Sequence, residues 1–370
     1  ASGDLHGEKL LHALYEKDLH LKVKGVGGPK MRAAGMECIL PMEKFQVMGF
    51  VDVFLALPRL IRQFYEVRRS ILEANPKAVV TIDYPGFNLR MAASLRKKGF
   101  KGKICHYICP SVWAWGKNRI DVMADNLDLL LTILPFEKQY FAHTSLDVQY
   151  VGHPLIQRIT SPATRPSGHL VAIFPGSRTK EIERNLPLHL KVAKTLLHEY
   201  PDLIFGVSVS DAGFLPLIEN MVEQAGIKVE FFSPDRKETL MKNAFLAIAK
   251  SGTVTLELAL YGVPAVVTYA VSPFDLFLAK YIFRIRLPYY CLVNIIAGQE
   301  VFPELIGPAL TETNLYLYIK KLIEDSGSCL EGCKEVRRLL GNIPTNDRSA
   351  DLILSLIKWP RYFVHRNERI

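Results

Sequence analysis

Two short turns in the second half of the chain carry residues that could bind an anion. The first, Pro175-Gly176-Ser177-Arg178, follows the apolar run 170–174 and precedes a helix-like stretch. The second, Ser251-Gly252-Thr253, occupies the same position after another apolar run. The free N–H groups at a helix start and the cation of Arg178 favour binding of a pyrophosphate. Each exposed contact with a helix dipole contributes only about 0.3–1 kcal/mol, so the arginine should contribute most of the binding. Either turn alone is also explained as an ordinary capped loop, with Ser177 as the cap.

Two carboxylates are candidates for further roles, one near the second turn and one at the end of a predicted strand. Glu257 follows Thr253 by just over one helical turn, where it could accept hydrogen bonds from a ribose diol. Asp83 ends an apolar stretch and precedes Pro85-Gly86. A carboxylate in that position can act as a general base that takes the proton from an attacking hydroxyl group. An Asx-turn or a helix cap explains Asp83 equally well.

Aromatic side chains follow another apolar run in the first half. Trp113 and Trp115, in the stretch PSVWAW, could form a wall against a sugar or an acyl chain, although core packing is the ordinary explanation. The sequence contains no Walker A motif, no G-x-G-x-x-G and no Asp-x-Asp pair. Its six cysteines lack the C-x-x-C spacing of a zinc site. We therefore expect neither a metal nor another cofactor.

Alternating strands and helices must position these residues. Helix-like segments such as 187–199 and 215–225 separate short apolar runs, and this alternation predicts parallel sheets with helices on both faces. In such sheets ligands bind beyond the carboxyl ends of the strands, where both turns and Asp83 are expected. The predicted strands are 78–83, 103–109, 127–134, 148–152, 170–174, 203–209, 229–232, 245–249 and 265–269.

The predicted organisation is two Rossmann-like halves, residues 1–158 and 169–343. The stretch 159–168, ITSPATRPSG, has no apolar period and is predicted to be the linker between them. Residues 344–370 form a last helix and a basic tail, which could pack back on the first half. The chain opens on a turn-like stretch and a helix, so the first strand of the first half is expected to be absent from this sequence.

The composition favours a cytoplasmic protein with a large core and an anionic partner. Hydrophobic residues make up 49% of the 370 residues and the net charge is +9. We find neither a secretory signal nor an apolar run of roughly 18 residues, and the cysteine usage favours a reducing compartment. A phosphorylated substrate or an acidic membrane surface could supply the anion. Nucleic acid is disfavoured because basic residues are spread along the chain without a helix-turn-helix, zinc-finger or RNP pattern.

Apolar residues beside arginines between positions 45 and 72 indicate a membrane contact. One stripe would suffice for packing on the core, namely Leu60, Phe64, Val67 and Ile71. The surplus matches an interfacial helix, and the expected membrane-contact residues are Phe50, Val53, Phe54, Leu57, Arg59 and Arg62. The segment 274–286 has the same mixture. Two ordinary buried helices are the alternative.

Several stretches that are weak individually form a specific ordered set across nearly the whole chain. They are SGD (2–4), GVGGPKMRAAG (25–35), VMGFVDV (47–53), IDYPGFN (82–88), HYICPSVWAW (106–115), ILPFE (133–137), VGHP (151–154), PGSR (175–178), SGTVTLE (251–257) and NIIAG (294–298). Together they resemble the bacterial lipid-A-disaccharide synthases of Gram-negative organisms, which are glycosyltransferases with the two-domain GT-B fold.

The resemblance implies an α/β protein with two doubly wound parallel-sheet domains that face a cleft. It implies an inverting transfer that joins UDP-2,3-diacylglucosamine to 2,3-diacylglucosamine 1-phosphate through a β-1,6 linkage and releases UDP, without a metal. The second domain would bind the UDP-sugar, and the first would bind the acceptor and contact the membrane. The enzyme would work as a peripheral protein on the cytoplasmic face of the inner membrane, and a homodimer is compatible with the resemblance.

The family pattern also implies roles for individual residues. Asp83 would be the base for the acceptor 6-hydroxyl, and Arg178 would stabilise the UDP leaving group. The UDP-binding residues would be Ser177, Ser251, Gly252, Thr253, Glu257 and Asn294. The acceptor or sugar contacts would be Ser2, Asp4, Trp113 and Trp115.

Departures from the family pattern leave alternatives open. The family strand that ends in Gly-Glu before SGD is not in this sequence, Gly116 separates Trp115 from Lys117, and Cys291-Leu292-Val293 replaces the usual Ser-Leu-Pro before Asn294. One alternative function is another GT-B enzyme that uses UDP-N-acetylglucosamine, either a 2-epimerase or the transferase of cell-wall lipid II synthesis. The other is a non-catalytic, membrane-associated nucleotide-sugar binder.

Overall fold

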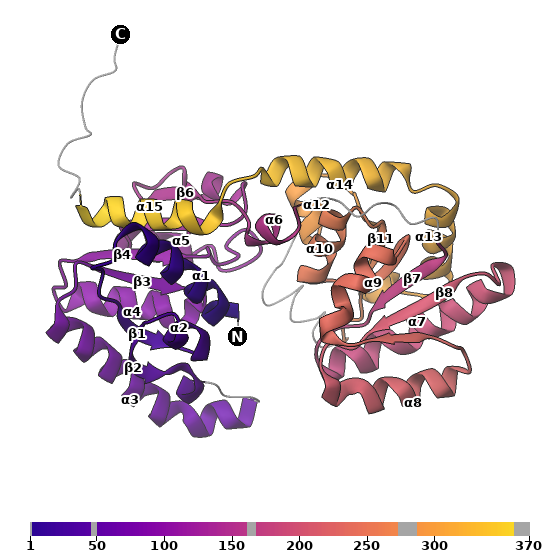
Figure 1. Cartoon of the computed structure of the whole chain (residues 1–370), viewed down its shortest axis with the longest axis horizontal. Helices are drawn as coiled ribbons and strands as arrows, with labels where there is room; N and C mark the ends of the chain where they lie inside the picture. Colours follow the sequence, from indigo (N-terminus) through magenta and orange to yellow (C-terminus); the bar gives the residue numbers. More distant parts are fainter. Residues whose placement is uncertain (1, 46–49, 161–167, 273–286, 359–370) are drawn as a thin grey trace, which may run out of the picture. The chain divides into compact units, whose positions relative to one another are not determined.

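The computed structural model describes residues 2–45, 50–160, 168–272 and 287–358 (Figure 1). Most of the predicted linker, the segment 274–286, the basic tail and the side chains of Phe50, Val53 and Phe54 lie outside the described residues. The chain divides into two compact units. Unit 1 consists of Ala1–Pro154 and Asn342–Ile370, and unit 2 of Leu155–Gly341.

Unit 1 is built on a parallel four-stranded sheet. Its strands lie in the order β3-β4-β5-β6, and β1 and β2 form a separate parallel pair. The strands are β1 (Lys24–Gly27), β2 (Glu37–Pro41), β3 (Ala78–Ile82), β4 (Lys103–Tyr107), β5 (Leu129–Thr132) and β6 (Asp147–Tyr150). The helices are α1 (Ser2–Lys17), α2 (Pro29–Ala33), α3 (Phe50–Ala74), α4 (Pro85–Lys97), α5 (Arg119–Asn126) and α15 (Thr345–Lys358).

Side chains alternate between the two faces of this sheet, so each face has its own core. On one face Ile104 and Leu130 pack with buried side chains of α4 such as Leu95. On the other face the next residues along the strands pack against α1 and α15, the last helix of the described residues. This second core contains Leu10, Leu14, Tyr107, Leu129, Leu131 and Ile353. The C-terminal helix therefore belongs to the packing of unit 1.

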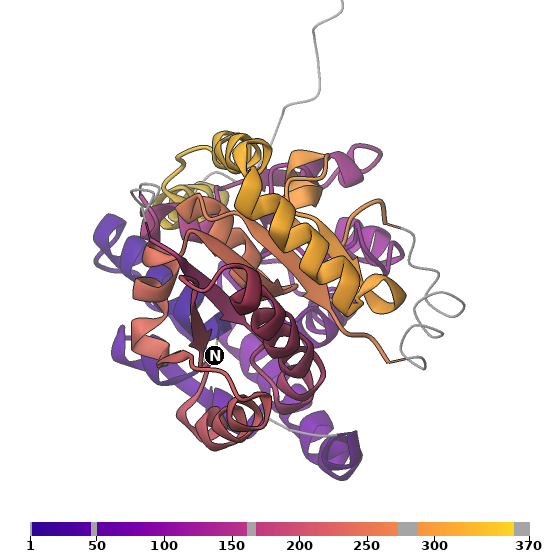
Figure 2. The ribbon, with the colours of Figure 1, turned by 90° about the vertical axis from the view of Figure 1, so that its right-hand side faces the viewer.

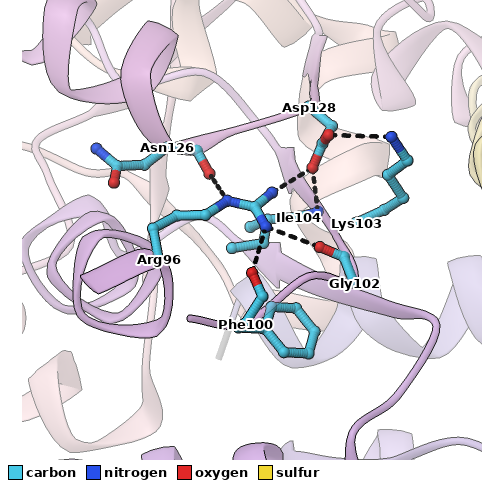
Figure 3. A network of polar contacts seen from close by, with 7 residues as sticks. All are labelled: Arg96, Phe100, Gly102, Lys103, Ile104, Asn126 and Asp128. Atoms are coloured by element: carbon cyan, nitrogen blue, oxygen red, sulfur yellow. Dashed lines mark hydrogen bonds and ion pairs between the residues drawn. The ribbon is translucent and has the colours of Figure 1, made fainter. Parts of the chain in front are cut away.

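A polar network connects the residues at the amino-terminal ends of β4 and β5 in the unit 1 sheet (Figure 3). The Arg96 guanidinium on α4 donates to the main-chain oxygens of Asn126, Phe100 and Gly102 and pairs with Asp128. Asp128 also accepts from the Ile104 N–H and pairs with Lys103 at 3.3 Å. These strand ends lie opposite the carboxyl ends, where ligands bind in such sheets, so we assign the network a role in stabilising the fold.

Unit 2 contains a parallel six-stranded sheet in the order β12-β11-β10-β7-β8-β9. Its strands are β7 (Leu170–Phe174), β8 (Ile204–Ser208), β9 (Glu230–Phe232), β10 (Leu246–Lys250), β11 (Ala265–Tyr269) and β12 (Glu304–Ile306). The helices are α6 (Pro154–Arg158, whose first residue belongs to unit 1), α7 (Thr179–Glu199), α8 (Leu215–Ala225), α9 (Lys237–Asn243), α10 (Thr253–Tyr261), α12 (Leu292–Ala297), α13 (Glu312–Glu324) and α14 (Gly327–Leu340).

Helices cover both faces of the unit 2 sheet. Helix α7 packs against α8 and α13, and a second group consists of α10 packed with α9, α12 and α14 (Figures 1 and 2). Helix α7 begins at Thr179, eight residues before the predicted start at 187, and it continues through Pro187. A proline inside a helix removes one hydrogen bond, and burial of Ile182, Leu186 and Leu190 compensates for that loss.

Candidate functional site

The direction of winding in unit 2 reverses between β7 and β10. From β7 the chain proceeds to β8 and β9 on one side and then to β10, β11 and β12 on the other. In open α/β sheets ligands bind at this switch point, beyond the carboxyl ends of the strands. The two predicted anion-binding turns follow β7 and β10 directly, and Phe174 is paired with Ala249. The structure thus brings the two turns side by side.

The turn after β7 depends on Gly176. Its φ of +133° is a conformation that side chains rarely adopt, and a Cβ there would lie 2.6 Å from the Glu181 Cβ. The expected side-chain cap at Ser177 is wrong, because the N-cap residue of α7 is Arg178, whose own side chain makes no capping hydrogen bond. Instead the Ser177 backbone N–H donates to Glu181 Oε2 at 3.0 Å. The Arg178 side chain is 81% exposed.

Glu181 and Lys250 are charged residues of this site that sequence reasoning missed. Glu181 Oε1 lies 3.3 Å from Arg178 Nη1 and 3.1 Å from Lys250 Nζ at the end of β10. Burial raises the pKa of the Glu181 carboxyl, but the Ser177 N–H and the two cations outweigh it and leave that pKa below its usual value. Lys250 also lies over the Tyr269 ring, 4.7 Å from its centroid. The sequence signal that could have identified Lys250 is its position directly before Ser251.

The turn after β10 starts α10 with exposed backbone. Gly252 is the N-cap residue of α10 without a side-chain cap, and Gly252 and Thr253 are exposed. The Ser251 N–H is used within the sheet, where it donates to the Thr268 carbonyl oxygen. Because the first N–H groups of a helix have no intrahelical acceptor, α10 directs such donors to the end of the sheet where Arg178 lies.

Glu257 lies further along α10 and is buried. Its carboxylate pairs with Arg158 of α6 at 2.8 Å and with Lys237 of α9 at 2.6 Å. These ion pairs join α6, α9 and α10 around the carboxylate. Contact between Glu257 and a ribose stays a prediction.

Asn294 of α12 is completely buried and uses its whole amide within the protein. Its Nδ2 donates to the Phe302 carbonyl oxygen and to Glu304 Oε1, both at 2.8 Å. Its Oδ1 accepts from the N–H groups of Val301 and Phe302. The predicted place of Asn294 in the lining of a nucleotide site is untested.

In unit 1 the carboxyl end of β3 carries Asp83 in a strained turn. Asp83 and Tyr84 have φ values of 50° and 45°, a region that costs non-glycine residues energy and that occurs often at functional sites. Asn88 stabilises the turn by donating to the carbonyl oxygens of Ile82 and Asp83. Tyr84, not Asp83, is the N-cap residue of α4. Among the described residues the Asp83 carboxylate has no hydrogen bond or ion pair, so it remains available to a substrate.

Two histidines lie at the same edge of unit 1 and were not found from the sequence. Burial lowers the pKa of His6 on α1, and the nearby charge of Asp83 opposes that shift. His6 also lies edge-on to Tyr107, with ring centroids 6.2 Å apart. His153 follows β6, and burial together with His6 lowers its pKa to about 4. His6 on α1 therefore lies near both Asp83 and His153 of the VGHP motif, although the three residues are far apart in sequence.

The aromatic stretch after β4 supplies one packed and one exposed tryptophan. Trp113 lies edge-on to Phe136, with centroids 5.7 Å apart. The neighbouring Glu137, after β5, is buried, accepts from the Leu134 N–H, and has its pKa raised to about 8 by burial. Trp115 is 46% exposed and the Arg119 guanidinium covers its ring at 4.1 Å. The predicted contact of either tryptophan with a sugar is untested.

The first helix places Ser2 and Asp4 differently. Ser2 is exposed, whereas Asp4 is buried and accepts from the backbone N–H groups of Lys30 and Met31 at 3.1 Å. Asp4 therefore caps α2, and a Cβ on Gly28 would lie 2.4 Å from Asp4 Oδ2. The predicted acceptor contacts of Ser2 and Asp4 are not tested by these interactions.

Helix α3 presents both a packed stripe and an exposed one. Phe64, Val67 and Ile71 contact the core, as expected. Large apolar side chains also face solvent with a spacing of four, namely Leu57, Ile61 and Tyr65. Arg59 and Arg62 are exposed beside them. Within the described part of the chain, no helix combines the length and the apolar character that a membrane span requires.

Comparisons with known proteins agree with the resemblance seen in the motifs. The chain is 40% identical to a lipid-A-disaccharide synthase of Chlamydia pneumoniae over 321 residues, 83% of this chain and 52% of that protein. It is 34% identical to the Pseudomonas putida lipid-A-disaccharide synthase, with 97% of this chain and 96% of that protein aligned. The chain thus spans about half the length of the chlamydial relatives and nearly all of the other.

Solved structures match the fold. A Neisseria meningitidis UDP-GlcNAc 2-epimerase bound to UDP-GlcNAc gives a TM-score of 0.60 at 10% identity, covering 96% of this chain and 97% of that one. Acinetobacter baumannii MurG gives 0.59 at 14% identity, with the same coverage. These likenesses confirm the predicted GT-B fold. The family profile described as lipid-A-disaccharide synthetase matches residues 1–348, and the chain therefore belongs to the lipid-A-disaccharide synthase family.

Proposed function

We propose that this chain transfers a diacylated glucosamine from UDP-2,3-diacylglucosamine to 2,3-diacylglucosamine 1-phosphate, forms a β-1,6 linkage with inversion, and releases UDP. The observation that carries the proposal is the switch point of unit 2, where Arg178 and the start of α10 follow neighbouring strands. A cation and free N–H donors at such a point suit a nucleoside diphosphate. Family membership supports the choice of sugar substrates.

Each unit would supply one part of the chemistry. Asp83 would take the proton from the acceptor 6-hydroxyl as that oxygen attacks the anomeric carbon. Arg178 would stabilise the negative charge that develops on the departing UDP, and loss of one such group costs about 10²–10³ in rate in other enzymes. The position of Asp83 in a strained turn, without a side-chain partner among the described residues, and the exposed guanidinium of Arg178 support these roles.

We further propose that the protein works on the cytoplasmic face of the inner membrane as a peripheral protein. The exposed stripe Leu57, Ile61 and Tyr65, with Arg59 and Arg62 beside it, supports this proposal. Apolar side chains flanked by arginines are typical of helices that lie in a membrane interface. Such a location suits substrates that carry acyl chains.

The experiment is UDP release from the diacylated donor, with and without the monophosphorylated acceptor. Asp83→Asn should lower acceptor-dependent UDP release by about 10²-fold or more, as expected for loss of a general base. The variant should still bind UDP, because Asp83 and the nucleotide site lie in different units. Asp121→Asn, which changes an exposed carboxylate on α5, is the matched control and should be as active as the unmodified chain.

The outcomes separate the alternatives. UDP release at the normal rate by the Asp83→Asn variant would contradict the base assignment. UDP release that does not depend on the acceptor would mean that water takes the sugar, and it would contradict the proposed transfer. Binding of UDP without any turnover would favour a non-catalytic nucleotide-sugar binder.

A further inference from the structure

Three donors in unit 2 converge on the single carboxylate of Glu181. The Ser177 N–H and the Lys250 ammonium group lie 3.0 and 3.1 Å from its oxygens, and the Arg178 guanidinium lies 3.3 Å away. The donors come from both sides of the switch point, since Ser177 and Arg178 follow β7 and Lys250 ends β10. The side chains of Glu181 and Lys250 are each only 16% exposed.

Helix capping accounts for only part of this arrangement. A glutamate at the third helical position often accepts from a backbone N–H at the helix start, which explains the contact with Ser177. Capping gives no reason for a lysine from the next strand to point at the same carboxylate. The Tyr269 ring and the end of β10 hold Lys250 in that direction. A carboxylate that gathers a backbone N–H and two cations imitates the oxygens of a bound phosphate.

We propose that Glu181 is an internal anion that occupies the diphosphate-binding donors while the site is empty, and that Lys250 is a second phosphate-binding cation. This inference rests on the proposed function, because it names residues of the same nucleotide site. When the diphosphate binds, it replaces the Glu181 carboxylate at Ser177, Arg178 and Lys250. Glu181 lines a pocket together with Asn185 and Tyr269.

Removal of the competing charge should therefore tighten nucleotide binding. Glu181→Gln keeps the size of the side chain but releases two charge-assisted contacts, so UDP affinity should rise roughly three- to tenfold. Lys250→Met should lower UDP affinity about tenfold or more and weaken its dependence on salt, while Lys250→Arg should restore most of it. Uridine, which lacks phosphate, should bind all these variants and the unmodified chain within about twofold of one another.

Isothermal titration of the full chain with UDP and with uridine provides the measurement. Matched controls are Lys191→Met and Glu312→Gln, because these residues form an exposed ion pair elsewhere in unit 2. Neither control should change UDP affinity. Thermal unfolding of each variant checks that the protein is folded. If Glu181 were a purely structural cap, Glu181→Gln would lower the unfolding temperature without any gain in UDP affinity.

The results distinguish failure of this inference from failure of the proposed function. If the unmodified chain binds UDP but Glu181→Gln binds it no more tightly, the internal-anion role is overturned. Unchanged UDP affinity in Lys250→Met overturns the role of Lys250, even if Glu181→Gln fails to fold. If the unmodified chain does not bind UDP at all, the nucleotide site of the proposed function fails, and this inference fails with it.

Discussion

At the residue scale, Asn294 illustrates a polar side chain that can support a site from within the core. Its amide holds the loop at 301–302 and the carboxylate of Glu304. Glu304 in turn accepts from the N–H groups of Tyr290 and Cys291, the residues directly before α12. Through Glu304, one buried amide thereby connects the residues directly before α12 to the loop that precedes β12. Its importance need not come from contact with a ligand.

This arrangement predicts the effects of two substitutions at Asn294. Asn294→Ala leaves buried donors and acceptors unpaired and should lower the free energy of unfolding by about 2–4 kcal/mol. Asn294→Asp should be worse at neutral pH, because its carboxylate would face Glu304 Oε1 at the present distance of 2.8 Å. Urea unfolding measures both effects. Asn243→Ala, at the exposed end of α9, is the control and should change stability by less than about 1 kcal/mol. Equal losses at positions 243 and 294 would contradict the organising role.

At the element scale, helix α3 carries a packed stripe and an exposed apolar stripe in one amphipathic pattern. The stripe at Phe64, Val67 and Ile71 holds it on unit 1. Of the exposed stripe, Tyr65 packs edge-on against Phe64, whereas Leu57 and Ile61 face solvent. Leu57 and Ile61 can therefore change without loss of the core. This separation makes the membrane proposal testable without unfolding the protein.

Replacement of Leu57 and Ile61 by serine should weaken binding to vesicles that contain anionic lipid. The apolar contact is lost while Arg59 and Arg62 keep the electrostatic attraction, so binding should fall several-fold without vanishing. Co-sedimentation with vesicles measures the bound fraction, and circular dichroism checks that the helix content is unchanged. Leu317→Ser is the control, because Leu317 is 53% exposed on α13 of the other unit. Unchanged sedimentation of the folded double variant would contradict a membrane contact at this stripe.

At the scale of the whole molecule, the strand pattern was predictable because most strands are runs of buried apolar residues. The nine predicted strands are confirmed as β3 to β11; β7 and β11 have the predicted ends, and the other seven have shifted ends. Strands β1, β2 and β12 were missed. Lys24–Gly27 holds two glycines and a lysine, and Glu37–Pro41 and Glu304–Ile306 are short and begin with a glutamate. The start of α7 was missed because Pro187 indicated a helix boundary.

The candidate site was predictable only where a residue stands directly at a strand end. The positions of Asp83 and Arg178 after strands are as predicted, because each follows a buried apolar run within four residues. The pairing of Glu181 with Lys250 depends on β10 lying beside β7, and the sequence does not contain that strand order. The same holds for His6 and His153, which come from opposite ends of the first 154 residues of unit 1. Side-chain types indicate chemistry, but the order of the strands decides which types meet.

Buried ionisable groups should make the stability of the whole molecule depend on pH, with a decline on both the acid and the alkaline side of a maximum. Burial lowers the pKa of His106 and of His153 to about 4, so the unfolded chain binds protons that the folded protein does not. Stability should therefore fall as the pH drops from about 6.5 to about 4. Glu137 acts in the opposite sense, because burial raises its pKa to about 8. The folded protein keeps a proton that the unfolded chain loses, so stability should fall as the pH rises from about 4.5 to about 8.

Glu137→Gln should remove the alkaline part of this decline. Between about pH 6.5 and 8 the two histidines no longer contribute, and Glu137 alone should cost up to about 1.4 kcal/mol per pH unit. Glutamine has a similar shape and no proton to lose, so the variant should be nearly flat in that range and keep the acid decline. Urea unfolding at fixed temperature from pH 5 to 8 measures the slope. Glu66→Gln, an exposed change on α3, should keep the original slope. A slope in Glu137→Gln equal to that of the unmodified chain would mean that Glu137 is already ionised in the folded protein at neutral pH.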